Sequence, residues 1–346
     1  MDIVKETMIR RINIDIKPFV STIVVTRNEQ KYIKRALLSL INQTYPHDRY
    51  EIIIVDGEST DSTLDIVNEI IKESKPDGTD ILIFSNPKLI LASGWNIGIK
   101  KSRGEYVVRI DAHSEVFPEF LKLNVETITS LGEDVACVGG RMTTKPLEGK
   151  ENAISKVLSS PFGVGNSSFR VSNKKGYSDT AVYGLYKKEV FDKVGLFNEF
   201  YVRNQDVELH SRIKQAGLKF YFNPEIKSIY YSRNTVKKMI NQALGNGKWN
   251  MVLLKSHRSA LSIRHLVPLV FVLFLIITSF MGIYAKEFWI LEGIVILLHL
   301  SLGWISAVEM TSDIAEIMVM PVLFLLLHIS YGIGYLTGIF IRPEGS

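Results

Sequence analysis

The 346-residue sequence contains a single cysteine and lacks the glycine motifs of several large enzyme classes. One thiol, Cys137, excludes an internal disulfide framework and agrees with a reducing compartment; its apolar surroundings (VACVGG) predict a core position. No G-x-G-x-x-G follows the first predicted strand and no G-x-x-x-x-G-K-[ST] occurs, which argues against dinucleotide oxidoreductases and P-loop hydrolases. The absence of G-x-S-x-G argues against a serine hydrolase with a nucleophile elbow.

Charge is almost missing from three long stretches near the carboxyl end. Residues 266–285 and 317–341 carry none, and 288–308 carry only Glu292. Each stretch is close to the ~20 residues that cross a bilayer as a helix. Buried core helices are the alternative, but three such stretches within about 80 residues, with hardly any amphipathic face, argue against it. The sequence therefore predicts three transmembrane helices, over about 266–285, 288–308 and 317–341.

Acidic residues are missing from 226–264, which hold eight Lys or Arg side chains. A basic segment directly before a membrane span fits the positive-inside rule and an anionic cytoplasmic leaflet, so we expect membrane lipid rather than nucleic acid as its partner. The acidic connector of Glu309, Asp313 and Glu316 would also be cytosolic, but acids weigh little in that rule. The polar start of the chain shows no signal peptide.

These features predict three regions. Residues 1–225 form a cytosolic domain, 226–264 form a basic interfacial segment, and 265–346 form the transmembrane region. The expected location is therefore the cell membrane, as a multi-pass protein whose first domain is cytoplasmic.

The first part of the chain alternates between strand and helix patterns. Apolar, β-rich runs at 21–26, 51–57, 81–86 and 105–111 are separated by helical patterns at 29–43, 59–74 and 92–102. This order predicts an α/β fold with a mostly parallel sheet and helices on both faces. Ligands of such sheets bind at the carboxyl ends of the strands, where Thr26, Asn28, Asp56 and Asp111 are expected.

The sequence RIDAHSE ends the fourth predicted strand. Asp111 and His113 are two positions apart, so on extended backbone their side chains point the same way and could hold a divalent metal. An isolated D-x-H is more often a solvated loop. The polar residues Thr26, Asn28 and Asp56, at two other strand ends of the same sheet edge, favour a ligand site.

Several ordered motifs resemble a known family. VSTIVVTRNEQKYIKRALLSLINQTYP, IIIVDGESTDSTLDIV, NIGIKKSRGEYVVRIDAH and GLYKKEVFDKVGLFNEFYVRNQDVELHSRIKQAGLKFYFNPE are similar to the inverting family 2 glycosyltransferases, which have the GT-A fold. DAH, SSPFGVGNSSFR, SDTAVYG and RNQDVEL are similar to the membrane-anchored, succinoglycan-type exopolysaccharide enzymes of that family. The resemblance covers about residues 19 to 250.

The resemblance implies a nucleotide-sugar site at the sheet edge. Asp56 could instead cap the following helix, and Asn96, in an Asn-x-Gly with Gly98, could be a polar residue inside a helix. The implied nucleotide-binding residues are Thr26, Asn28, Glu29, Asp56, Asn96 and Asp111.

The resemblance also implies a metal cofactor, because Asp111 and His113 match the family's Asp-x-Asp with His in place of the second Asp. The ion would be Mn²⁺ or Mg²⁺ and would stabilise charge on the departing diphosphate. Imidazole shifts the preference toward Mn²⁺.

The acceptor half of the family pattern implies a catalytic base. Asp206 in RNQDVEL matches it, although Gln205 stands where the family usually has Glu. A helix N-cap is the alternative role, and Glu208 is the second candidate base. Lys248 in GNGKWN is expected to contact the donor diphosphate, or to belong to an ordinary interfacial amphipathic helix.

The predicted function is transfer of a hexose from a nucleotide sugar, a UDP-hexose, to a polyprenyl-linked saccharide acceptor. A long loop at 145–179 is expected to contact that acceptor. A polyprenyl-phosphate sugar synthase is the alternative within the class. A catalytically inactive, membrane-tethered nucleotide-sugar-binding module is the alternative from another class.

Overall fold

The computed structural model describes residues 17–74, 78–146, 151–165, 169, 172–232, 235–257 and 260–342. The chain divides into two compact units. Unit 1 comprises residues 1–140, 175–196 and 218–228, and unit 2 comprises 141–174, 197–217 and 229–346. The three regions expected from the sequence remain a prediction.

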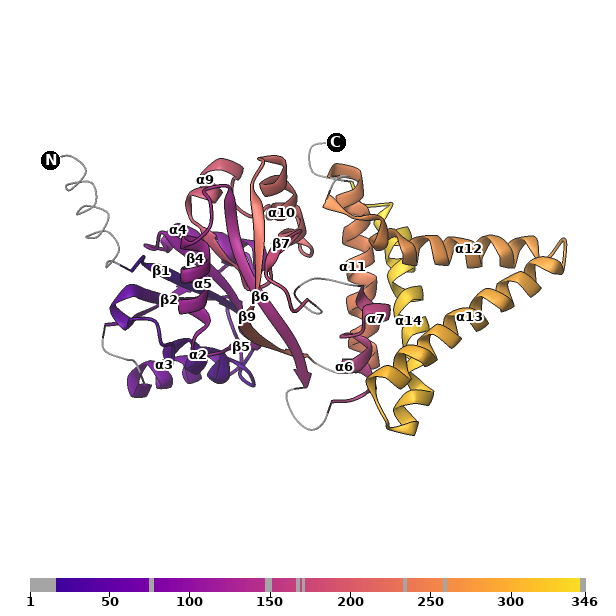
Figure 1. Ribbon diagram of the computed structural model, residues 1–346, viewed down its shortest axis with the longest axis horizontal. Coiled ribbons are helices and arrows are strands. Elements are labelled where there is room, and N and C mark those ends of the chain that lie inside the picture. The colour runs from indigo at the N-terminus through magenta and orange to yellow at the C-terminus, as the bar shows by residue number, and fades with distance from the viewer. Residues whose placement is uncertain are drawn as a thin grey trace. The chain divides into compact units, whose positions relative to one another are not determined.

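Unit 1 is built on a mixed sheet with helices packed on it (Figure 1). The predicted alternation of strands and helices is confirmed: β1 Val20–Thr26, α2 Ile33–Ile41, β2 Tyr50–Asp56, α3 Thr63–Ser74, β3 Asp80–Ser85, α4 Leu91–Lys101 and β4 Tyr106–Asp111. A 3-10 turn, His47–Arg49, precedes β2. The unit continues with β5 Ser114–Val116, α5 Phe120–Thr129, β6 Val135–Pro146, β7 Gly176–Ser178, β8 Leu185–Lys187, α9 Glu189–Val194 and β9 Lys219–Ser232, although β6 and β9 end in unit 2.

The strand order β3-β2-β1-β4-β8-β6-β9-β5 creates a switch point between β1 and β4. β1 pairs in parallel with both β2 and β4, while the strands after β4 add an antiparallel half that begins with β8. Right-handed crossovers place α2 and α3 on one face and α4 on the other, because the chain reverses direction across the sheet after β3. Ligands of open α/β sheets bind at such a point.

The centre of the sheet is fully buried and apolar. Val20, Ile53, Val108 and Cys137 have at most 1% of their surface exposed. Burial raises the pKa of the Cys137 thiol, so this side chain behaves as a hydrophobic core residue, as predicted.

Glycines let α4 approach β1 closely. A Cβ on Gly98 would lie 2.4 Å from Cγ2 of Ile23, and one on Gly94 would lie 2.6 Å from Cγ1 of Val25. The absence of a side chain at Gly98 is therefore explained by the close packing of α4 on β1.

Replacing Gly98 with Ala is expected to lower the free energy of unfolding by about 1–3 kcal/mol, because α4 must move away from β1. Gly176→Ala is the matched control, since no atom lies within 4 Å of the position of its Cβ. Thermal unfolding of the two variants measures the difference. Equal melting temperatures would contradict the packing role.

Unit 2 is mainly helical. Its elements are α6 Ala153–Val157, α7 Pro161–Val164, α10 Gln205–Gln215, α11 Val236–Ser256, a 3-10 turn Ile263–Leu266, α12 Val267–Met281, α13 Glu287–Met310 and α14 Ile314–Gly338. The expectation of one long loop over 145–179 was wrong, because α6 and α7 form there and β7 follows. Residues 147–150, 166–168, 170 and 171 of that segment lie outside the described part.

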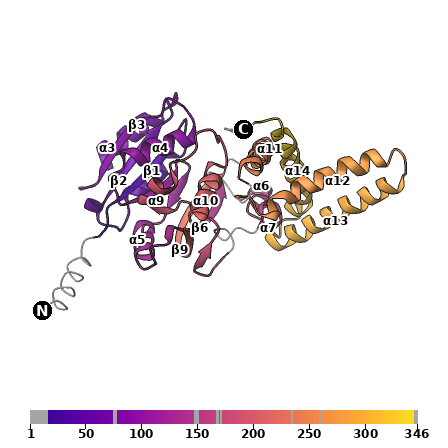
Figure 2. The same ribbon diagram turned by 90° about the horizontal axis from the view of Figure 1, so that it is seen from above.

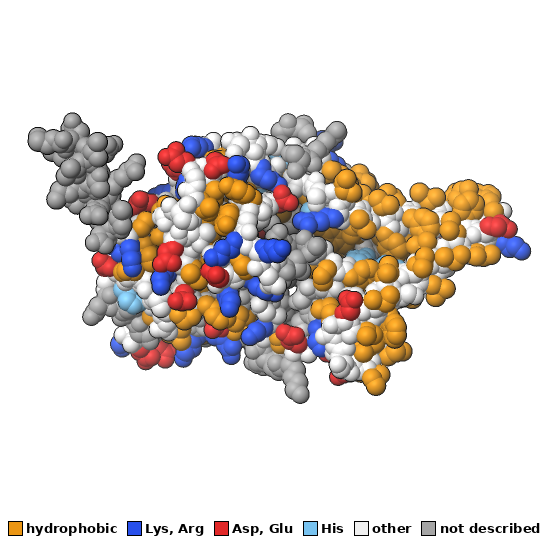
Figure 3. All heavy atoms as spheres, in the orientation of Figure 1, with side chains coloured by type: hydrophobic (Ala, Val, Ile, Leu, Met, Phe, Trp, Pro, Cys, Tyr) orange, Lys and Arg blue, Asp and Glu red, His pale blue; other side chains and the backbone are white. Residues whose placement is uncertain are grey.

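Three helices are long and apolar enough to cross a membrane: Ile263–Met281, Glu287–Met310 and Ile314–Gly338. They correspond to the predicted spans. α12 and α13 form a hairpin (Figures 1 and 2). Hydrophobic side chains cover most of its visible surface, and charged side chains appear at its tip (Figure 3).

α14 packs along α11 through glycines. A Cβ on Gly334 or Gly338 would lie 2.3 Å from the carbonyl oxygen of Leu244 or Lys248, and one on Gly247 would lie 2.0 Å from that of Tyr331. A Cβ on Gly332 would likewise lie 2.3 Å from the carbonyl oxygen of Pro268 in α12. These small residues therefore let α11, α12 and α14 pack closely within the chain.

Candidate active site

The carboxyl ends of β1, β2 and β4 bring the predicted donor residues of unit 1 together. Thr26 pairs with Asp56 across β1 and β2, and Val25 pairs with Asp111 across β1 and β4. Asp56 is 4% exposed and accepts hydrogen bonds from the Ser59 N–H (2.9 Å) and hydroxyl (2.6 Å). The two carboxylates thus flank the end of β1.

The loops after β1 and β2 are joined by hydrogen bonds. The N–H of Asn28 donates to Ser59 Oγ (2.9 Å), and Asn28 Oδ1 accepts from the Thr60 N–H (2.8 Å). The N–H of Glu29 donates to Thr63 Oγ1 (2.8 Å). Asn28 adopts the left-handed backbone region (φ 53°), which Asn tolerates better than most residues. Its side chain therefore fixes the loop.

Asp61 anchors the start of α3. It accepts hydrogen bonds from the Thr63 hydroxyl (2.5 Å) and N–H (3.0 Å) and from the Gln30 N–H (3.3 Å). Burial acts to raise the pKa of this carboxyl, but the hydrogen bonds outweigh it and lower the pKa below its usual range. An ionised Asp61 therefore holds the loop of Gln30 to the start of α3.

Two of the buried side-chain polar atoms that lack a hydrogen-bond partner among the described residues lie at the ends of β1 and β3. They are Thr26 Oγ1, at the end of β1, and Asn86 Oδ1, just after β3. Asn86 is held by its N–H, which donates to the Asp56 carbonyl (2.7 Å), and by its Nδ2, which donates to the Ile90 carbonyl (2.9 Å). Unsatisfied buried groups are costly, so both atoms are candidates for ligand contact. Sequence reasoning missed Asn86, although its place directly after a strand was a usable signal.

Asp111 is held by a tyrosine that sequence reasoning also missed. The Tyr183 hydroxyl donates to Asp111 Oδ2 (3.2 Å), and the Ser114 hydroxyl donates to the Asp111 carbonyl (2.5 Å). Tyr183 is 2% exposed and has a positive φ of 45°, unusual for a bulky residue. Such strain often accompanies a functional site. Tyr183 lies in the SDTAVYG motif, which was the available signal.

His113 lies beside Glu29. Its Nδ1 is 3.4 Å from Glu29 Oε1, and the ring packs edge-on against Tyr32 with 6.1 Å between centroids. Within the described ranges, no group of three or more His, Cys, Asp or Glu side chains forms a metal cage.

Asn96 lies in the middle of α4 and is 5% exposed. Its neighbour Trp95 packs under the guanidinium of Arg109 at 5.3 Å.

The predicted base belongs to unit 2. Asn204, in a left-handed conformation (φ 59°), takes the N-cap position of α10, and the helix begins at Gln205. The alternative role of Asp206 as the helix N-cap was therefore wrong: Asp206 lies in the first turn, and its Oδ1 accepts the Val207 N–H at 2.9 Å. A carboxylate there is favoured in its ionised form by the helix dipole.

Amide side chains fix the loop before Asp206. Asn204 Nδ2 donates to Asn250 Oδ1 (2.6 Å) and to the Asn246 carbonyl (3.4 Å), and Arg203 Nη1 donates to Asn246 Oδ1 (3.3 Å). Lys248 is exposed on α11, the helix that carries both asparagines.

The sequence model of "Glycosyl transferase family 2" matches residues 21–195. The chain is also 32% identical, over 93% of its length and 97% of the relative's, to the Methanococcus voltae "Dolichyl N-acetyl-alpha-D-glucosaminyl phosphate 3-beta-D-2,3-diacetamido-2,3-dideoxy-beta-D-glucuronosyltransferase". The chain belongs to glycosyl transferase family 2. The resemblance seen in the sequence is thus confirmed.

Other relatives agree with this membership. The glycosyltransferase is 26% identical to the "Succinoglycan biosynthesis protein ExoA" of Rhizobium meliloti, over 70% of this chain and 72% of that one. Its fold resembles that of "Mannosyltransferase PcManGT from Pyrobaculum calidifontis in complex with GDP-Man and Mn2+", with a TM-score of 0.57, 16% identity, and coverage of 92% of this chain and 88% of that chain. The predicted GT-A fold is confirmed.

Glu208, the second candidate base of this glycosyltransferase, is buried and paired with basic side chains. Its side chain is 2% exposed and receives both Nε (2.6 Å) and Nη2 (2.8 Å) of Arg212, and His257 Nε2 lies 3.6 Å away. Such a paired carboxylate is oriented by its partners rather than presented to a substrate.

We expect Glu208→Ala to lower the free energy of unfolding by about 3 kcal/mol, because it leaves Arg212 without its buried partner. Glu189→Ala, on the exposed first turn of α9, is the control and is expected to change stability little. Thermal unfolding in detergent measures both. A stable Glu208→Ala protein that has lost only activity would instead make Glu208 catalytic.

Proposed function

We propose that this family 2 glycosyltransferase transfers a hexose, with inversion, from a nucleoside diphosphate sugar to a saccharide carried on a lipid phosphate. The observation that carries the proposal is the pair of carboxylates, Asp56 and Asp111, at the ends of the strands on either side of β1. Together with Thr26 and Asn28 they form a polar edge at the carboxyl ends of the strands, where ligands of such sheets bind. A UDP-hexose is the proposed donor.

The residues near Asp111 suit a metal ion shared with the substrate. One carboxylate and one imidazole are too few for a closed protein cage, but Mg²⁺ and Mn²⁺ commonly take their remaining ligands from substrate phosphates and water. Glu29 beside His113 Nδ1 would hold that nitrogen protonated and leave Nε2 as the ligand. When bound, the ion supplies positive charge to the diphosphate leaving group. We therefore propose Asp111 and His113 as the ligands.

The chain's own residues have separate tasks in this proposal. Thr26, Asn28, Asp56 and Asn96 bind the nucleotide, and Lys248 contacts the diphosphate. Tyr183 keeps the Asp111 carboxylate oriented. The Asp206 carboxylate accepts the proton of the acceptor hydroxyl. At the same time the hydroxyl oxygen of the acceptor bonds to the anomeric carbon of the donor sugar, and the bond between that carbon and the diphosphate breaks.

The proposed acceptor follows from the relatives and from the apolar helices. The M. voltae relative is named for a dolichyl-phosphate-linked sugar, and three helices here could cross a membrane. We propose that these helices anchor the chain in the membrane, with residues 1–225 on the cytoplasmic side and a polyprenyl-phosphate-linked saccharide as the acceptor.

Nucleotide release tests the proposal. Detergent-purified full chain is incubated with a panel of UDP- and GDP-sugars in Mn²⁺, Mg²⁺ or EDTA. The expected result is slow release of nucleoside diphosphate from one donor, faster with Mn²⁺ than with Mg²⁺ and stopped by EDTA. Release from no donor, together with no metal-dependent binding of UDP or GDP by calorimetry, would overturn it.

A further inference from the structure

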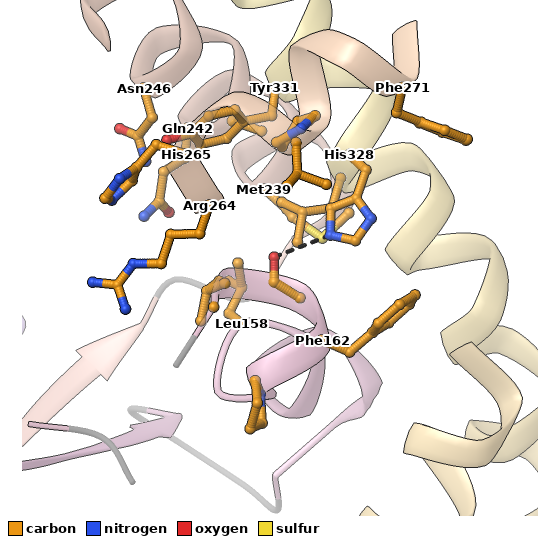
Figure 4. A pocket seen from close by; sticks show the side chains of 18 of the residues that line it. Leu158, Phe162, Met239, Gln242, Asn246, Arg264, His265, Phe271, His328 and Tyr331 are labelled. Carbon is orange, nitrogen blue, oxygen red and sulfur yellow. Dashed lines mark hydrogen bonds between the residues drawn. The ribbon is translucent and has the colours of Figure 1, made fainter. Parts of the chain in front are cut away.

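Unit 2 contains a pocket of about 480 Å³ that none of the proposed donor or base residues lines. Its wall comes from α7, α11, the start of α12, α13 and α14. In Figure 4 the polar side chains Asn246, Gln242, His265 and Arg264 lie on one side, and Phe271 and Phe162 lie on the other. The pocket therefore has a polar side and an apolar side.

The polar side is suited to an anion. Arg264 supplies a permanent positive charge. The N–H of Ser262 donates to His265 Nδ1 (3.1 Å), so the proton of a neutral His265 ring resides on Nε2, which can donate to a ligand. Gln242 adds a side-chain amide, and the carbonyl of His265 is fixed by the Tyr335 hydroxyl (2.9 Å).

The opposite side is lined by rings. Phe271 stacks on His299 with centroids 5.1 Å apart, and Phe162 packs edge-on against His328 at 5.4 Å. His328 Nε2 donates to the Gly163 carbonyl (3.3 Å), so His328 Nδ1 accepts from His299 Nε2 (2.8 Å). These bonds fix the two imidazoles side by side in the wall, where their rings pack with those of Phe162 and Phe271.

The pocket lies where a membrane lipid would present its phosphate. Arg264 and His265 belong to the turn that begins the first candidate span, and Phe271 lies two turns further along α12. Basic residues at the end of a span meet lipid phosphates, while residues farther along meet hydrocarbon.

The polar side is also joined to the loop of the proposed base. Asn246 lines the pocket and binds Arg203 and Asn204, the residues that lead into Asp206. Tyr331 lines it too, and its hydroxyl accepts from Asn250 Nδ2 (2.6 Å), which is bonded in turn to Asn204. A sugar attached to a phosphate that is bound at the polar side of the pocket would therefore lie on the side of the loop that leads into Asp206.

We propose that this pocket holds the lipid end of the acceptor, with the phosphate at Arg264 and His265 and the first isoprenoid units between Phe271 and Phe162. This assignment rests on the proposed function, which supplies a lipid phosphate as part of the substrate. The volume is within the range of small-ligand pockets, so only the head end of a long lipid fits.

Farnesyl phosphate is the probe, because it combines one phosphate with three isoprenoid units. Its binding to the detergent-purified full chain is measured by calorimetry, beside farnesol and inorganic phosphate. We expect Arg264→Gln to weaken farnesyl phosphate binding about tenfold to a hundredfold and to leave farnesol binding unchanged. Phe271→Ser is expected to weaken both ligands.

Matched controls lie on the same helices outside the pocket. Lys238→Gln, on α11, and Phe280→Ser, an exposed phenylalanine of α12, are expected to bind like the unchanged chain. Phe271→Leu replaces Phe271→Ser should the latter fail to fold, as judged by melting temperature.

The assignment would be overturned if the Arg264 and Phe271 variants bound farnesyl phosphate as tightly as the unchanged chain does, or if the unchanged chain did not bind it. It would also be overturned if phosphatidylglycerol competed for the pocket as well as farnesyl phosphate does. Donor turnover in the same preparations is a separate readout. A protein that consumes no nucleotide sugar but loses farnesyl phosphate binding in Arg264→Gln would refute the proposed transfer and retain the pocket.

Discussion

Asp206→Asn is expected to lower the rate of sugar transfer by about 10²–10⁴-fold, because the acceptor hydroxyl loses the carboxylate that takes its proton. Asn is nearly isosteric and can still accept the Val207 N–H, so α10 should remain folded. Transfer to a lipid-linked acceptor under donor saturation gives the rate. Calorimetry with the nucleoside diphosphate is expected to show unchanged donor affinity.

Asp192→Asn is the matched control, since Asp192 is an exposed aspartate in the first turn of another helix, α9. It should transfer sugar at the rate of the unchanged chain. An Asp206→Asn protein that transfers within a fewfold of that rate would exclude Asp206 as the base.

Asp111→Asn is expected to lower kcat/KM for the donor at least about 100-fold, because it removes the negative charge that attracts the metal next to the diphosphate. The amide can still accept the Tyr183 hydroxyl, so the melting temperature should change little. The measurement is donor turnover as a function of Mn²⁺ concentration. The half-saturating concentration should rise with the loss of rate.

Asp65→Asn, at an exposed position on the first turn of α3, controls for the loss of one charge from unit 1. Its Mn²⁺ dependence should match that of the unchanged chain. If Asp111→Asn needed no more Mn²⁺ than this control and kept its rate, Asp111 would not be a metal ligand.

Local sequence signals were enough to predict the first half of the sheet. A buried parallel strand is a short apolar run, and β1, β2 and β4 each end in a polar residue that could be assigned to the sheet edge. The three-residue strand β8 carries no such signal. Leu185 and Tyr186 become strand residues only because they pair with β4 on one side and β6 on the other, contacts that are distant in sequence.

The same limit applies to the site. Asp111 could be predicted from its place after an apolar strand, but its partner Tyr183 lies 72 residues away and is brought there by the antiparallel half of the sheet. Glu29 could be grouped with the nucleotide residues but not with His113, because the bend after β1 decides its direction. Gly98 looked like part of a binding motif, and only the distance to Ile23 reveals the close packing.

The most direct test of the account is the transfer reaction itself. The purified full chain is incubated with the donor identified by nucleotide release, Mn²⁺ and a polyprenyl-phosphate-linked saccharide, and the product is followed by mass spectrometry and NMR. We predict one added sugar on the lipid-linked acceptor, with the anomeric configuration inverted relative to the donor and no product in EDTA. A product of retained configuration, or sugar transferred equally well in EDTA, would contradict the account.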